Sequence, residues 1–138
     1  MLFHIRKKML QLSYIAMQKT ICGLKVIVKR LYVIEGIIMS EKVYSIEEIS
    51  QIILPLIKKY RASKVILFGS YARNEADKDS DIDVLVIGGD AFDPTDVFCI
   101  ADELNRISQK KVYVYEEREI NHTSAFYNTI ISEGVEIA

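Results

Sequence analysis

The chain has 138 residues, of which 50% are hydrophobic and 27% are charged, a composition that excludes a disordered polyelectrolyte and fits one globular domain. Its formal net charge of −1 conceals an asymmetry, because residues 1–38 carry seven basic side chains and one acidic one. No uninterrupted apolar run reaches the roughly 18–20 residues that a membrane-spanning helix needs, so the sequence predicts no transmembrane segment.

Residues 1–38 form a basic N-terminal extension. Four apolar residues recur there at helical spacing, Leu10, Tyr14, Met17 and Ile21. One interpretation is a basic amphipathic helix that contacts a membrane or a nucleic acid. The other is that the segment arises from an upstream start assignment, since composition and charge change at Met39. Both stay open, and we assign the functional domain to residues 39–138.

Residues 45–137 read as an alternation of helices and strands. Ser45 and Glu48 form a capping box, and the apolar stripe that follows to Tyr60 contains Pro55, which we expect to kink or restart the helix. The further predicted elements are strands at 65–68, 81–87 and 111–115, a helix from Asp93-Pro94 to about Ile107, a helix at 121–131, and a short strand at 135–137.

Two carboxylates stand two residues apart at the start of the second predicted strand. Side chains at positions i and i+2 of a strand project from the same face, so Asp81 and Asp83 should lie side by side. Two negative charges at that separation repel each other unless a cation lies between them. Carboxylate oxygens suit Mg²⁺, which also takes substrate phosphate oxygens. We therefore predict a magnesium site at Asp81 and Asp83.

A second motif follows the first predicted strand. Gly69 allows a sharp turn and a close approach of the backbone to a ligand. Ser70 would present its hydroxyl and its amide at the N-terminus of a short helix, where phosphate is favoured. Arg73 would either contact a phosphate or pair with an acidic residue of the loop at 74–80. We predict a phosphate-binding turn that faces the two carboxylates.

The compound motif Gly69-Ser70-Tyr71-Ala72-Arg73 with Ser80-Asp81-Ile82-Asp83-Val84 resembles the signature of the nucleotidyltransferase superfamily related to DNA polymerase β. The resemblance covers about residues 45–137 and is closest to the minimal members. It implies an α+β fold, with a small mixed sheet and helices packed on one side. It also implies that Gly69 and Ser70 hold ATP, that Asp81 and Asp83 bind magnesium, and that AMP is transferred to a hydroxyl. Many minimal members are antitoxins paired with a HEPN toxin, and some adenylylate a tyrosine of that toxin.

One position departs from the family pattern. The family usually carries a third carboxylate on the strand after the second helix, and this sequence has Tyr113 there. Glu117 has the same strand parity but lies about 13 Å further on at ~3.3 Å per residue, so we expect no replacement. Two functions follow: a magnesium-dependent adenylyltransferase acting as antitoxin, or a weakly active or inactive binding module that neutralises a toxin by direct contact.

The remaining signals are weaker. Cys22 and Cys99 lack metal-ligand spacing, and such low cysteine usage fits a reducing cytosol. His122 has no partner at catalytic spacing and is expected in a surface loop. Because residues 39–138 carry an excess of acidic side chains, we do not expect direct binding of nucleic acid. The partners that the family resemblance implies are ATP and a HEPN toxin, and we expect the protein in the cytoplasm.

Overall fold

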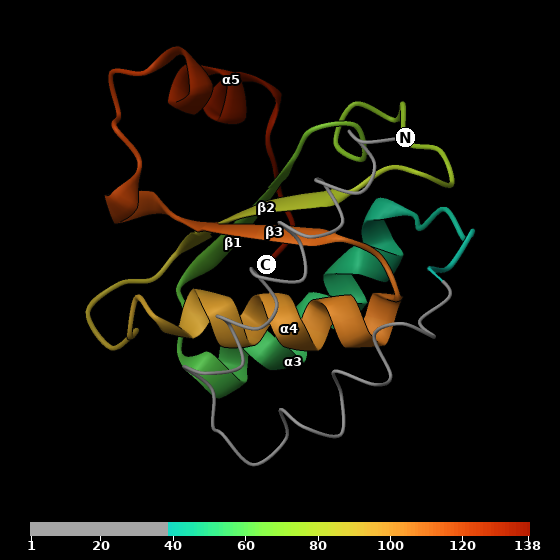
Figure 1. Cartoon of the computed structure of the whole chain (residues 1–138). Helices are drawn as coiled ribbons and strands as arrows, with labels where there is room; N and C mark the ends of the chain where they lie inside the picture. Colours follow the sequence, from blue (N-terminus) through green and yellow to red (C-terminus); the bar gives the residue numbers. More distant parts are fainter. Residues whose placement is uncertain (1–38) are drawn as a thin grey trace, which may run out of the picture.

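A computed structural model describes residues 39–138, and the predicted extension at 1–38 lies outside the described residues. The elements in chain order are α3 (Ile46–Tyr60), β1 (Lys64–Phe68), β2 (Ile82–Ile87), α4 (Asp96–Ser108), β3 (Val112–Glu116), the 3-10 helix η2 (Glu117–Glu119), α5 (Ala125–Glu133) and β4 (Val135–Glu136) (Figure 1). Within this part of the chain, no helix has the length and apolar character needed to cross a membrane.

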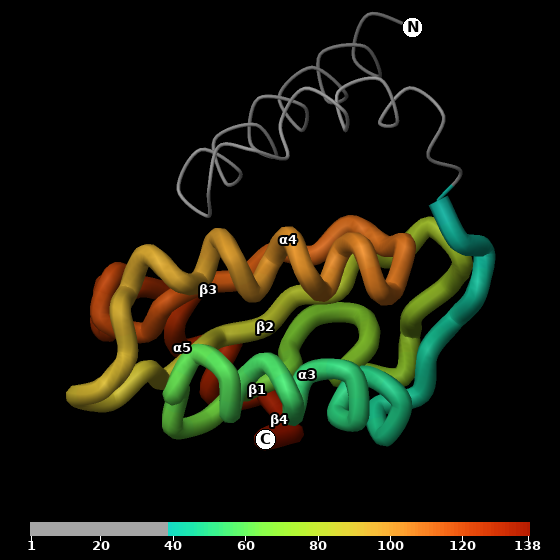
Figure 2. Tube along the Cα trace, turned by 90° about the horizontal axis from the view of Figure 1, so that it is seen from below, coloured from blue at the N-terminus to red at the C-terminus, as the bar shows by residue number. Residues whose placement is uncertain are grey.

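The strands form one mixed sheet, as predicted, and their order in it is β3-β2-β1-β4. β1 is antiparallel to both β2 and β4. β2 is parallel to β3, and α4 makes the crossover between them. Helices α3 and α4 lie side by side over one face (Figure 2), whereas α5 lies against the opposite face (Figure 1). The expectation of helices on one side therefore holds for α3 and α4, and α5 is the exception.

Alternation along the strands divides the core between the two faces. Val65 and Leu67 of β1 pack with α3 and α4, whereas Phe68 packs with α5 through Ile130. Successive side chains of a strand point to opposite faces, which explains this division. In β2 the same rule places Val84 toward α3 and α4 and turns Asp83 toward the face of α5.

Helix α3 begins with the predicted capping box. The Ser45 hydroxyl accepts from the Glu48 backbone N–H at 3.1 Å, and the Glu48 carboxylate accepts from the Ser45 N–H at 2.9 Å. The expected restart at Pro55 is absent, since one helix runs through it. Buried side chains on both sides of the proline, Ile53 and Leu56 among them, hold the helix against the sheet, and this packing outweighs the missing backbone hydrogen bond.

Two further boundaries differ from the prediction. The second helix begins at Asp96 with Thr95 as its N-cap, because Asp93 instead closes a preceding turn by accepting from the Thr95 N–H at 3.0 Å. The last helix begins at Ala125, where the Ser124 hydroxyl accepts from the Tyr127 N–H at 3.1 Å. In both cases the N-cap lies nearer the helix than the predicted start, but only Ser124 caps with its side chain, since the Thr95 hydroxyl donates to Asp93.

Candidate active site

The two predicted motifs meet at the contact between Gly69 and Asp83. Phe68, the last residue of β1, pairs with Asp83 in the register of the sheet, so Gly69 turns beside the Asp83 side chain. A Cβ atom built on Gly69 would lie 2.7 Å from Oδ2 of Asp83. Gly69 also has φ of +75°, a conformation that side chains rarely adopt. The position thus requires glycine both for its conformation and for the space that the carboxylate fills.

A single turn follows Gly69 in place of the predicted short helix. The Gly69 carbonyl accepts from the Arg73 N–H at 3.1 Å, and the Ser70 carbonyl accepts from the Glu75 N–H at 2.9 Å. Tyr71 anchors this turn, because its ring is buried in the core shared with α3 and α4. Ser70 and Arg73 are therefore held at the surface on a turn whose middle is fixed in the protein interior.

Asp81 and Asp83 lie close enough to affect each other. Burial and the negative charge of Asp81 raise the pKa of Asp83 to about 6, and Arg73 opposes this shift. Glu133 adds a further negative charge on the same side. A carboxylate whose ionised form is disfavoured by burial and by neighbouring acids gains most from a bound cation.

The pair fits the requirements of magnesium. Among the described residues, no cluster of three or more histidine, cysteine or acidic side chains could hold a metal by itself. Mg²⁺ does not require such a cluster, since it commonly binds one or two carboxylates and completes its shell with phosphate oxygens and water. Asp81 and Asp83 would supply the protein ligands, and the nucleotide would supply the others.

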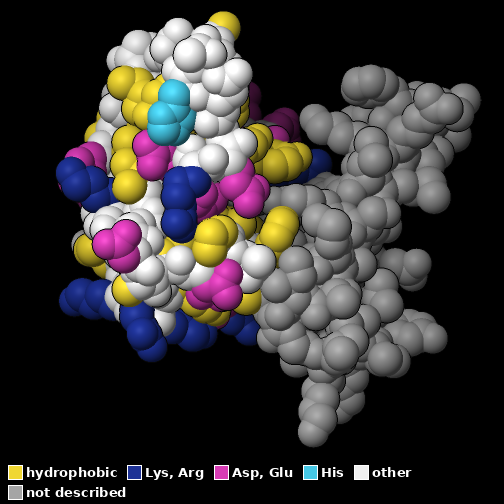
Figure 3. All heavy atoms as spheres, turned by 90° about the vertical axis from the view of Figure 1, so that its left-hand side faces the viewer, with side chains coloured by type: hydrophobic (Ala, Val, Ile, Leu, Met, Phe, Trp, Pro, Cys, Tyr) yellow, Lys and Arg dark blue, Asp and Glu magenta, His cyan; other side chains and the backbone are white. Residues whose placement is uncertain are grey.

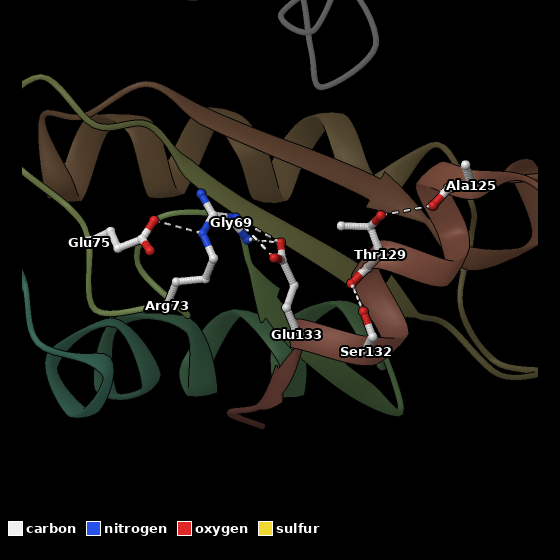
Figure 4. Close-up of polar contacts among 7 residues, drawn as sticks. All are labelled: Gly69, Arg73, Glu75, Ala125, Thr129, Ser132 and Glu133. Atoms are coloured by element: carbon white, nitrogen blue, oxygen red, sulfur yellow. Dashed lines mark hydrogen bonds and ion pairs between the residues drawn. The ribbon is translucent and has the colours of Figure 1, made fainter.

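Glu133, which no sequence pattern singles out, occupies the other side of the turn. Its Oε1 accepts from the Gly69 N–H at 3.0 Å, and its two carboxylate oxygens accept from Nη1 of Arg73 at 3.1 and 3.0 Å. Arg73 also donates from Nε to Glu75 at 2.9 Å, which is one of the two roles expected for it, a pairing with an acidic residue of the 74–80 loop. Figure 4 shows the Arg73 guanidinium between the two glutamates. Arg73 lowers the pKa of Glu133, and the Gly69 N–H adds to that effect.

No acidic side chain stands across from Asp83 on β3. Asp83 pairs with Tyr113, so the tyrosine occupies the register position at which the family pattern has its third carboxylate. Val86 pairs with Glu116, which places Glu117 beyond the far end of β2. The expectation that Glu117 does not replace the acid is confirmed. The candidate site has two carboxylates on β2 and the loop before it, with Glu133 as a third acid beside the Gly69 turn.

A pocket of about 510 Å³ opens beside Asp81. Its size is in the range of small-molecule sites, but Asp83, Gly69 and Ser70 do not line it. Its lining residues are Met39, Lys78, Asp79, Ser80, Asp81, Lys110 and Lys111. His122, by contrast, is exposed at the surface beside α5 (Figure 3), where its ring stacks on Tyr127 at 4.3 Å. The prediction of a surface histidine is confirmed.

Comparison with known proteins identifies relatives along nearly the whole described part. Residues 50–138 match the family model described as "Polymerase beta, Nucleotidyltransferase". The chain is 33% identical over 93 residues to "Putative protein adenylyltransferase MJ0435" of Methanocaldococcus jannaschii. The aligned region covers 67% of this chain and 98% of that protein. A second protein of that organism, "Putative protein adenylyltransferase MJ0604", is 47% identical over 47 residues, 33% of this chain and 47% of the relative.

Solved structures with the same fold come from toxin-antitoxin complexes. One, a toxin-antitoxin with AMP-PNP, superposes with a TM-score of 0.56 at 21% identity and covers 64% of this chain and 72% of that chain. Another contains the tri-AMPylated HEPN toxin of Shewanella oneidensis in complex with an MNT antitoxin, with a TM-score of 0.51 at 20% identity over 65% and 69% of the two chains. The family model spans both motifs of the site, and the chain belongs to the polymerase β-type nucleotidyltransferase family.

Proposed function

We propose that this protein is a magnesium-dependent protein adenylyltransferase that moves AMP from ATP to a tyrosine hydroxyl of a HEPN toxin and thereby acts as its antitoxin. The observation that carries the proposal is the seating of the Asp83 carboxylate against Gly69. This contact joins the predicted metal ligands to the predicted phosphate-binding turn. The relatives are described as protein adenylyltransferases, and the structural neighbours are toxin-antitoxin complexes. Both observations support a toxin protein as the acceptor of AMP.

The chain's own residues have distinct roles in this reaction. Gly69 and Ser70 offer backbone and hydroxyl donors to the phosphates, and Arg73 adds a charge-assisted contact. Asp81 and Asp83 hold magnesium, which when bound polarises the α-phosphate and stabilises the pyrophosphate that leaves. The acceptor oxygen forms a bond to the α-phosphorus, the bond to the β-phosphate oxygen breaks, and the hydroxyl proton passes to solvent. The proposed location is the cytoplasm, where ATP and magnesium are available.

A transfer assay tests this function. The purified chain is incubated with ATP labelled at the α-phosphate, magnesium and a purified HEPN toxin from the same organism. We expect labelled toxin, and a loss of at least about 100-fold for Asp81→Asn or Asp83→Asn, because each removes a charge that stabilises the transition state. Asp90→Asn is the matched control, since this exposed loop acid follows the opposite end of β2 and undergoes the same change of charge. Chelation of magnesium should abolish transfer, whereas transfer that persists in both active-site variants would refute the proposal.

The alternative is a binding module that neutralises the toxin without chemistry. Tyr113 opposite Asp83 is the observation that favours it, because it leaves the site with two carboxylates. The double variant Asp81→Asn/Asp83→Asn separates the two functions in cells that express the toxin. Protection that survives in the double variant supports neutralisation by binding, and protection that is lost supports catalysis.

A further inference from the structure

The donors assigned to the nucleotide's phosphates already bind an anionic group of the protein. The Gly69 N–H and the Arg73 guanidinium both donate to the carboxylate of Glu133, at 3.0 to 3.1 Å. The three groups come from the turn after β1 and from the last residue of α5, as Figure 4 shows. A carboxylate and a phosphate present oxygen acceptors of similar geometry to an arginine, so Glu133 occupies a position that a phosphate group would take.

The backbone around Glu133 fixes this arrangement. Gly134 directly follows it, and a Cβ atom built there would lie 2.4 Å from Cγ2 of Ile66 and 2.4 Å from the Ile130 carbonyl. The Gly134 N–H donates to that carbonyl at 2.8 Å. Ile130 is fully buried against the sheet. The end of α5 is thus packed tightly on β1, and this packing directs the Glu133 side chain toward Gly69.

We propose that the Glu133 carboxylate competes with the phosphates of the nucleotide for the Gly69 N–H and Arg73, so that the nucleotide must displace it to bind. The inference rests on the nucleotide-binding function proposed above and adds an internal competitor to it. Two anions cannot share the same donors without strong repulsion, and the nearby Asp83 would add to that repulsion. Glu133 therefore lowers nucleotide affinity and keeps the turn ordered when no nucleotide is bound.

Glu75 provides an internal comparison. It also binds Arg73, at 2.9 Å, but has no hydrogen bond to Gly69 among those in the described residues. Its side chain is 64% exposed, against 19% for Glu133. Ion pairs at exposed positions are weak. The same substitution at the two glutamates thus removes a charge beside Arg73 in both cases, but removes the negative charge that accepts from the Gly69 N–H in only one.

The test is a calorimetric titration of the full chain and its variants with a non-hydrolysable ATP analogue in the presence of magnesium, repeated with inorganic tripolyphosphate without metal. Glu133→Gln keeps an oxygen that can accept from Gly69 but loses the charge. We expect it to bind both ligands about tenfold more tightly than the wild type, a gain typical of removing one charged competitor. Glu75→Gln should change affinity by less than about twofold. Glu133→Asp, which is shorter by one methylene, should give an intermediate gain and serves if the glutamine variant does not fold.

The outcomes separate this inference from the proposed function. If the wild type binds the ATP analogue and Glu133→Gln binds it equally or more weakly, the inference is wrong and Glu133 instead positions Arg73. If neither the wild type nor any variant binds the analogue, nucleotide binding itself is refuted, and the inference with it. If Glu75→Gln gains as much affinity as Glu133→Gln, the gain is a general effect of removing a negative charge near Arg73, and the inference of competition at Gly69 is wrong.

Discussion

The two faces of the sheet differ in what their side chains do. The face toward α3 and α4 carries an unbroken apolar core that includes Val65, Val84 and Val114. The face toward α5 buries only a small cluster of Phe68, Leu85 and Ile130, and the same face carries Asp83. Stability is therefore concentrated on one side and the candidate chemistry on the other.

The largest effect should come from cavities made on the two faces. Ile100 of α4 and Ile130 of α5 are both fully buried. We expect Ile100→Ala to lower the free energy of unfolding by about 3–4 kcal/mol, and Ile130→Ala by about 2 kcal/mol, since half-buried neighbours can relax into the smaller cavity. Denaturation in urea measures both values. Equal losses would show that the two faces contribute equally to stability.

A smaller loss of stability should follow from replacing Gly69, the glycine that contacts Asp83. Gly69→Ala forces alanine into φ of +75° and toward the Asp83 carboxylate, so we expect a loss of about 2 kcal/mol in stability together with loss of AMP transfer. Gly89→Ala is the matched control, because Gly89 has φ of +76° but its added Cβ would meet only the hydroxyl of Ser63, at 2.8 Å. The control should lose stability and retain transfer. Loss of transfer in both variants would contradict a specific role of Gly69.

The smallest effect concerns the charge at Asp83, whose pKa is raised to about 6. In the metal-free protein, Asp83 is protonated in both the folded and the unfolded chain below about pH 4, so its raised pKa does not affect stability there. Above about pH 6 it is ionised in both, and because the folded state disfavours the ionised form, the charge lowers the free energy of unfolding. Asp83→Asn removes this penalty, so we expect it to stabilise the chelator-treated protein by about 1–2 kcal/mol at pH 8 and not at pH 4. Thermal unfolding at the two pH values measures the difference. Asp79→Asn, in the exposed loop, should show no such pH-dependent gain.

Much of the fold follows from local patterns that the sequence displays directly. The capping box at Ser45, the apolar strands and the alternation that turns Asp83 away from Val84 each depend on residues a few positions apart. The same holds for the Gly69 turn and its carboxylate partner, because the compound motif specifies both. Local periodicity also places the buried side of α4, including Ile100 and Leu104.

Contacts between distant segments were not predictable in this way. Glu133 reaches Gly69 across 64 positions of sequence, and nothing in its local context distinguishes it from other glutamates. The placement of α5 on the second face depends equally on tertiary packing at Ile130. The helix expected after Ser70 is a single turn, since burial of Tyr71 fixes the backbone there. Tertiary contacts outweigh local propensity at these positions.

The pairing of β4 bears on the order in which the molecule is made. Ile66 and Leu67 pair with Glu136 and Val135, and the Val65 N–H donates to the Ala138 carbonyl at 2.9 Å. While the ribosome is still synthesising the chain, β1, β2 and β3 can pair and bury their common core before β4 has emerged. The nascent protein thus acquires its stable side first. The helix that carries Glu133 to the Gly69 turn, and the strand β4 that follows it, are added last.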